Sequence, residues 1–204
     1  MKIPTPSVSR RAATALLAAV VLNAGTSLAM AADALAPKVK FATTEGDFVV
    51  EVYPDKAPKT VENFLQYVKD KHYDGTIFHR VIDNFMLQGG GYDTSYAERK
   101  TRAPVVHEGR EALARGGAKN VAGTLAMART SDPNSASSQF FINVKDNDFL
   151  NPSAQAPGYT VFGKVASGMD VVNRIKAAPT GAGGPFPSDV PRTPVVIKSA
   201  TLVN

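Results

Sequence analysis

The sequence contains no cysteine, and this absence excludes several kinds of protein and site. A chain without thiols has no disulfide scaffold, no cysteine nucleophile, no iron–sulfur cluster and no thiolate zinc site. Histidines are few as well: His72, His79 and His107 are the three, and no pair has the spacing of metal ligands on one helix or strand. We therefore expect neither a metal site nor a cofactor.

The motifs of common hydrolase and nucleotide-binding sites are also missing. The sequence has no G-x-S-x-G motif and no P-loop. The glycines at 89–91 are not followed by the Lys-Ser or Lys-Thr pair that a phosphate-binding loop needs. We interpret this glycine run as a flexible or tightly turning strand end.

No apolar run reaches the roughly 20 residues that span a bilayer. The longest, residues 12–22, follows the basic residues Lys2, Arg10 and Arg11 and precedes the triplet Ala29-Met30-Ala31. A basic start, a short apolar region and small residues at a cleavage site are the three parts of a secretory signal. We predict a cleavable signal peptide over 1–31, a linker over 32–38 and a periplasmic location. A membrane anchor is the alternative, and the route of export (Sec or twin-arginine) stays open.

The predicted signal peptide changes the interpretation of the charge. The whole chain has a formal charge of +5, which suggests a polyanionic partner. The signal peptide carries three of the 23 basic residues and none of the 18 acidic ones, so the remainder has 20 against 18, or +2. We therefore expect no nucleic-acid partner, and no membrane association after cleavage.

Short β-type runs dominate residues 39–204, which we interpret as one domain. The eight runs are 39–42, 47–53, 76–82, 85–88, 123–128, 139–143, 160–165 and 195–202. Apolar residues at helical spacing predict helices over 60–69 and 169–175. This pattern predicts a mainly β fold, a closed eight-stranded antiparallel β-barrel capped by two α-helices, since closure removes exposed strand edges. The Gly- and Pro-rich segment 179–191 is expected to be a long surface loop.

Arg80 is the most informative single residue, because it lies within an apolar strand pattern. A charged side chain there must find partners or open onto a cleft, and from the residues alone a structural salt bridge remains an alternative. Around and after it come F-H-R-V-I-D-N-F-M-L-Q-G-G at 78–90, S-Q-F-F-I-N at 138–143 and V-F-G-K-V at 161–165. In this order and spacing, the chain resembles the cyclophilin family of peptidyl-prolyl cis–trans isomerases, in particular its exported bacterial branch.

The resemblance implies a site without nucleophile or metal. Arg80 and Gln88 would be the catalytic residues, and Gln88 and Gln139 would hydrogen-bond the substrate backbone. The residues implied in substrate binding are Phe85, Met86, Ala128, Arg129, Gln139, Phe141, Phe149, Leu150 and Tyr159. Arg129 stands where eukaryotic members commonly have asparagine, and the contact there would be made partly by the main chain. Phe149 and Tyr159 stand where many eukaryotic members have tryptophan and histidine.

The implied reaction suits these residue types. An X-Pro bond rotates over a barrier of about 18–20 kcal/mol, and no bond is broken. The arginine would donate to the proline nitrogen as the amide twists, while the apolar wall grips the ring. We expect a monomeric isomerase that acts on proline-containing segments of unfolded exported proteins and assists their folding. A proline-peptide binding or chaperone module with incidental turnover is the alternative, and the intact Arg80 favours the enzyme.

Overall fold

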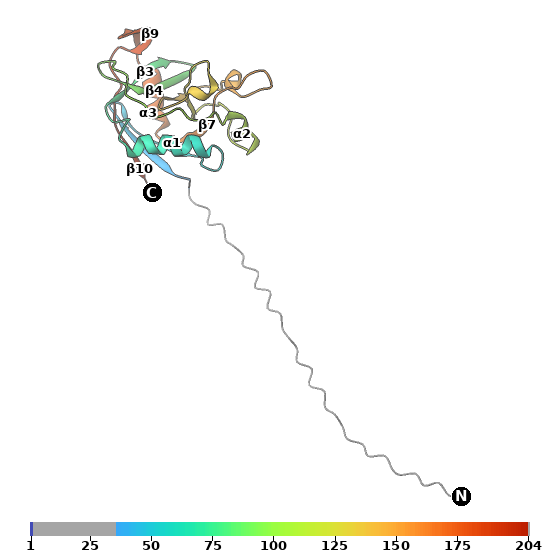
Figure 1. Ribbon diagram of the computed structural model, residues 1–204. Helices are drawn as coiled ribbons and strands as arrows, with labels where there is room; N and C mark the ends of the chain where they lie inside the picture. The colour runs from blue at the N-terminus through green and yellow to red at the C-terminus, as the bar shows by residue number, and fades with distance from the viewer. Residues whose placement is uncertain (2–35, 204) are drawn as a thin grey trace. The chain divides into compact units, whose positions relative to one another are not determined.

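The computed structural model describes Met1 and residues 36–203 (Figure 1). The predicted signal peptide over 1–31 and residues 32–35 of the predicted linker lie outside the described residues. Residue 38, assigned to the linker from the sequence, is already part of the first strand. Within the described part of the chain, no helix is long and apolar enough to cross a membrane.

Eight antiparallel strands form the main sheet, and the strand count predicted from the sequence is confirmed. Along the sheet the order is β10-β1-β2-β7-β5-β6-β4-β3. The strands are β1 Lys38–Thr43, β2 Gly46–Val52, β3 Thr76–Ile82, β4 Met86–Asp93, β5 Thr124–Met127, β6 Phe140–Asn143, β7 Val161–Ser167 and β10 Ile197–Val203. Each lies within a few residues of its predicted run. Burial alternates along β1 and β2, whereas β5 and β6 are buried throughout and form short apolar runs.

The prediction of a closed barrel is wrong: the sheet is an open half-barrel that curls through 249° and ends at β10 and β3. Between these ends there is one isolated bridge, Ile77 with Val196, flanked by a hydrogen bond from the Phe78 amide to the Val195 carbonyl at 3.0 Å. The pairing of β3 with β4 shifts register on both sides of Phe78. Such bulges bend and twist a strand, so the pairing of β3 with the β10 side does not continue past Phe78.

The segment 179–191, expected to be a surface loop, forms a second two-stranded sheet of β8 Thr180–Gly183 and β9 Phe186–Pro191. In Figure 1, β9 lies next to β3, on the side away from α1. The Phe186 ring packs 5.3 Å from His79 and 5.1 Å from Tyr92. Glycine and proline have weak strand propensity, so the composition suggested a loop. The packing of Phe186 on the main sheet compensates for that weak propensity.

Both predicted helices are present, and the structure contains a third helix that was not predicted from the sequence. They are α1 Pro58–Lys69 and α3 Met169–Lys176, while α2 Gly109–Ala114 was not predicted. Single 3-10 turns also occur at Pro133–Ser135 and Asp148–Leu150. The helix α2 has only six residues, too few to show a helical period in the sequence.

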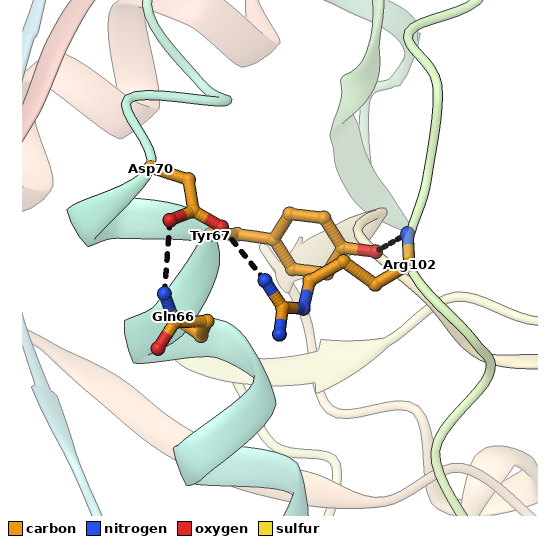
Figure 2. A network of polar contacts seen from close by, with 4 residues as sticks. All are labelled: Gln66, Tyr67, Asp70 and Arg102. Carbon is orange, nitrogen blue, oxygen red and sulfur yellow. Dashed lines mark hydrogen bonds and ion pairs between the residues drawn. The ribbon is translucent and has the colours of Figure 1, made fainter.

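The long segment between β4 and α2 is fastened to α1 at two points. At the helix start, the Glu108 carboxylate accepts hydrogen bonds from the Thr60 amide and hydroxyl, both at 2.8 Å. This satisfies an amide that the first turn leaves without a partner, and a negative charge suits the positive end of the helix. At the helix end, Figure 2 shows Arg102 donating to Asp70 through its guanidinium at 3.0 Å and to the Tyr67 hydroxyl through its amide at 2.8 Å.

Two hydrophobic clusters lie on opposite faces of the same strands. On β6, Phe140 and Ile142 belong to the main core, whereas Phe141 belongs to the second cluster. On β4, Leu87 faces the main core and Met86 the second cluster. Because successive side chains of a strand point to opposite faces, one set of strands supplies both the core and a small apolar patch on the other face.

Candidate active site

Strand pairing brings three predicted site residues into one row across the sheet. Arg80 on β3 pairs with Gln88 on β4, Gln88 pairs with Phe141 on β6, and Phe141 pairs with Ala126 on β5. Met86 lies two residues before Gln88 and therefore shares its face. Gln88 and Phe141, which are 53 positions apart in the sequence, thus become neighbours through register alone.

These residues surround one cavity of about 100 Å³. Its lining comprises Arg80, Phe85, Met86, Gln88, Ala128, Arg129, Phe141, Leu150 and Tyr159. Nine of the eleven residues implied from the sequence therefore meet at a single place. The lining is apolar on the side of the second cluster and polar on the side of Arg80 and Gln88.

The other two predicted residues lie beside the cavity. Gln139 accepts a hydrogen bond from the Gln88 side-chain amide at 3.0 Å, and it lines an adjoining cavity of about 280 Å³. Phe149 is 74% exposed, and its ring stacks on Phe85 at 5.7 Å. Phe149 therefore supports the wall from outside rather than lining the pocket. The adjoining cavity also contains Glu98, a residue that the sequence analysis missed because no motif surrounds it.

The Arg80 guanidinium is uncommitted. Arg80 is exposed, and among residues 36–203 no hydrogen bond or ion pair involves its side chain. The structural salt bridge that the residues alone left open is thus absent from the described part of the chain. A guanidinium presents five donors in a rigid, permanently charged fork, so Arg80 offers this fork to whatever occupies the cavity.

Arg129 uses its side chain within the protein. Its guanidinium donates twice to the Gly158 carbonyl, at 3.1 and 2.8 Å, and lies 4.6 Å from the centre of the Tyr159 ring. The Tyr159 ring in turn meets Phe141 edge-on at 5.4 Å. The guanidinium therefore fixes the Tyr159 side of the cavity. Arg129 also lines the cavity, where the resemblance implied a peptide contact made partly by the main chain.

His79, next to Arg80 on β3, is held neutral. Burial, with a smaller contribution from the positive charge of Arg80, lowers the pKa of His79 to about 4. The histidine is 3% exposed and lies on the opposite face from the cavity, against Tyr92 and Phe186. It therefore takes no part in the pocket, and among the described residues no three His, Asp or Glu side chains are grouped as metal ligands would be.

The arrangement combines an apolar pocket with a free guanidinium and two linked glutamines. Such a pocket can bury a compact apolar ring while donors hold the adjoining peptide groups. Burial in an apolar wall also strengthens those polar contacts by excluding water. Within the cavity, nothing in this set is a nucleophile paired with a base, which fits a reaction that changes conformation and breaks no bond.

Comparison with known proteins assigns the chain to a family. Residues 38–202 match the family model described as "Cyclophilin type peptidyl-prolyl cis-trans isomerase/CLD". A peptidyl-prolyl cis-trans isomerase of Acinetobacter baylyi is 50% identical over 185 residues, covering 90% of this chain and 94% of that protein. Peptidyl-prolyl cis-trans isomerase B of Escherichia coli is 50% identical over 167 residues, covering 80% and 98%.

A solved structure agrees with the fold. The cyclophilin-type isomerase of Cryptosporidium parvum superposes with a TM-score of 0.64 at 25% identity, covering 83% of this chain and 98% of that one. The chain therefore belongs to the cyclophilin-type family. It is a peptidyl-prolyl cis-trans isomerase, a rotamase.

Proposed function

We propose that the cavity around Arg80 is the isomerase active site and that Arg80 stabilises the twisted X-Pro amide. In this proposal the proline ring occupies the apolar side formed by Phe85, Met86 and Phe141. Gln88 and Gln139 hold the backbone of the bound peptide. The observation that carries the proposal is the juxtaposition of an uncommitted guanidinium and an apolar pocket in one cavity.

The chemistry follows from the electronic structure of the amide. Resonance across the C–N bond makes up the barrier of about 18–20 kcal/mol, and twisting the bond localises the lone pair on the proline nitrogen. A fixed N–H donor beside that nitrogen interacts more strongly with the twisted amide than with either planar form. Only such differential stabilisation accelerates the reaction. The apolar wall holds the ring, so the rest of the peptide rotates relative to it.

The proposed substrates are proline-containing peptide segments. A structure of the Cryptosporidium parvum cyclophilin was determined in the presence of the dipeptide Ala-Pro, and it superposes on this chain with a TM-score of 0.63 at 26% identity. A cavity of about 100 Å³ suits a small ring rather than a large side chain. This size supports proline as the buried group.

The substitution Arg80→Ala tests the active-site proposal. We expect kcat/KM on a short X-Pro peptide, measured in a protease-coupled assay, to fall by orders of magnitude, because the donor to the proline nitrogen is gone. The melting temperature should hardly change, since Arg80 makes no internal hydrogen bond. The matched control is Arg110→Ala. It removes an exposed arginine that lies on α2, outside the cavity lining, and should keep wild-type turnover. Wild-type turnover in Arg80→Ala would refute the role given to Arg80.

We further propose that the enzyme is exported to the periplasm and assists the folding of exported proteins. The support is the order of basic residues, the apolar run 12–22 and the triplet ending at Ala31 in the sequence. The test is N-terminal sequencing of the protein recovered from periplasmic and cytoplasmic fractions. We expect a periplasmic protein that begins at Ala32. A cytoplasmic protein that keeps residues 1–31 would contradict this proposal.

A further inference from the structure

A chain of three buried asparagines connects opposite sides of the active-site cavity. Asn143 ends β6, Asn147 lies in the following turn and Asn120 lies before β5. Their exposed fractions are 0%, 2% and 0%. We call these three residues the asparagine relay. Asn143 is the last residue of the S-Q-F-F-I-N motif, and the proposed mechanism leaves it without a role.

The hydrogen bonds of the relay run without a break from one pocket residue to another. The Asn147 side-chain amide donates to the Phe85 carbonyl at 2.9 Å and to the Asn143 side-chain oxygen at 2.8 Å. The Asn143 amide donates to the Asn120 side-chain oxygen at 3.2 Å. The Asn120 amide then donates to the Leu150 carbonyl, also at 3.2 Å.

Both ends of the relay are residues that line the cavity. The Leu150 carbonyl also accepts a hydrogen bond from the Tyr159 amide at 3.0 Å, so a third lining residue is tied to the same end. At the other end, the Phe85 carbonyl also accepts from the Val144 amide at 3.1 Å. The relay therefore fixes Phe85 on the β3–β4 turn relative to the loop that carries Leu150 and Tyr159.

Asparagine is the residue type that such a relay needs. Its side chain offers two N–H donors and an accepting oxygen at one short, planar group. Asn143 uses all three, because its amide also donates to the Thr124 hydroxyl at 3.0 Å. An aspartate would lose the donors, and a threonine would supply only one. A buried polar network with its partners present is rigid, and a gap in it is costly.

We propose that the asparagine relay is a positioning element of the isomerase, which holds Phe85 and Leu150 at the separation that grips the proline ring. The three asparagines do not touch the substrate. They act through the main chain of residues that do, so their loss should weaken peptide binding more than the rotation step. This inference rests on the proposed active site, because it presumes that the cavity binds proline.

The substitution Asn147→Ala tests the proposal, because it frees the Phe85 end and leaves the bonds among Asn143, Asn120 and Thr124 in place. We expect KM for an X-Pro peptide to rise about five- to tenfold, the effect of losing about one hydrogen bond. We expect kcat to stay within about threefold of wild type, because the relay makes no hydrogen bond to Arg80. Both constants come from cis–trans exchange measured over a range of peptide concentrations, well below the melting temperature.

Thr76→Val is the matched control. It removes a buried side-chain hydrogen bond to a main-chain carbonyl, that of Tyr73 at 2.6 Å, away from the cavity lining. We expect a lower melting temperature with wild-type KM and kcat. If Asn147→Ala also lowers the melting temperature and leaves KM at the wild-type value, the relay is only structural and the proposal is overturned. Asn143→Ala should reproduce the rise in KM, and Asn147→Ala decides the matter where Asn143→Ala does not fold.

The outcome is distinguishable from a failure of the active-site proposal. If Arg80→Ala keeps wild-type turnover, the role proposed for Arg80 fails, whatever the KM of Asn147→Ala. If Arg80→Ala loses turnover while Asn147→Ala keeps its KM, the active site stands and the relay proposal alone is wrong.

Discussion

The burial of His79 makes the stability of the protein depend on pH. The imidazole is 3% exposed, and its ring centre lies 4.8 Å from that of Tyr92 and 5.3 Å from that of Phe186. Burial lowers its pKa from 6.5 to about 4, with a further contribution from the positive charge of Arg80. Protonating His79 in the folded state therefore places a charge in an apolar contact that fastens β9 to the main sheet.

The sign and size of the effect follow from linkage between protonation and folding. Between pH 6.5 and 4 the unfolded chain binds a proton at this histidine and the folded chain does not, so the free energy of unfolding rises with pH. The stability that the neutral, buried His79 contributes is fully present above pH 6.5 and is lost as the pH falls to about 4. The difference between the two pKa values corresponds to about 3 kcal/mol.

Urea unfolding at a series of pH values measures this contribution. His79→Phe is the comparison, because it keeps an aromatic ring between Tyr92 and Phe186 and removes the titration. Between pH 7 and 4.5 we expect wild type to lose more unfolding free energy than the variant, by up to about 3 kcal/mol. Burial also lowers the pKa of His72 and His107, but both remain in the variant, so their effect cancels. Parallel pH profiles for the two proteins would refute the reasoning.

Two further predictions concern the walls of the cavity. Phe141→Ala should raise KM and lower the free energy of unfolding by about 3–5 kcal/mol, whereas Phe140→Leu, on the opposite face of β6, should lower stability at wild-type KM. Peptide titrations and melting curves separate the two effects, and equal KM values in the two variants would contradict the pocket assignment. Arg129→Lys should weaken peptide binding severalfold, because lysine lacks the fork that holds the Gly158 carbonyl. Unchanged affinity in a binding titration would show that this contact does not shape the pocket.

Local patterns in the sequence account for the strands and the two longer helices, and motif resemblance accounts for the cavity lining. The curvature of the sheet was not predictable in the same way. It depends on register shifts beside Phe78, which arise from pairing between strands and leave no period in the sequence. The β8–β9 hairpin was missed for a related reason: it is anchored by the contact of Phe186 with His79, residues more than 100 positions apart.

The site was predictable where a residue touches the cavity and unpredictable where it acts through another residue. Phe149 was expected to bind substrate, but it is exposed and supports Phe85 from outside. The asparagine relay joins partners that are 62 positions apart at one end and 30 at the other. Nothing near Asn147 in the sequence indicates that its amide reaches Phe85. Only the folded arrangement of the turns reveals that contact.

The alternation of the two hydrophobic clusters along β4 and β6 has a consequence for how this enzyme can diversify. Leu87 and Ile142 face the main core, while their neighbours Met86 and Phe141 face the cavity. A substitution at Met86 or Phe141 therefore acts directly on the cavity and the second cluster, whereas one at Leu87 or Ile142 acts on the main core. Substrate preference and the packing of the main core are therefore carried by adjacent residues of the same strands, and a change at Met86 or Phe141 affects the first more directly than the second.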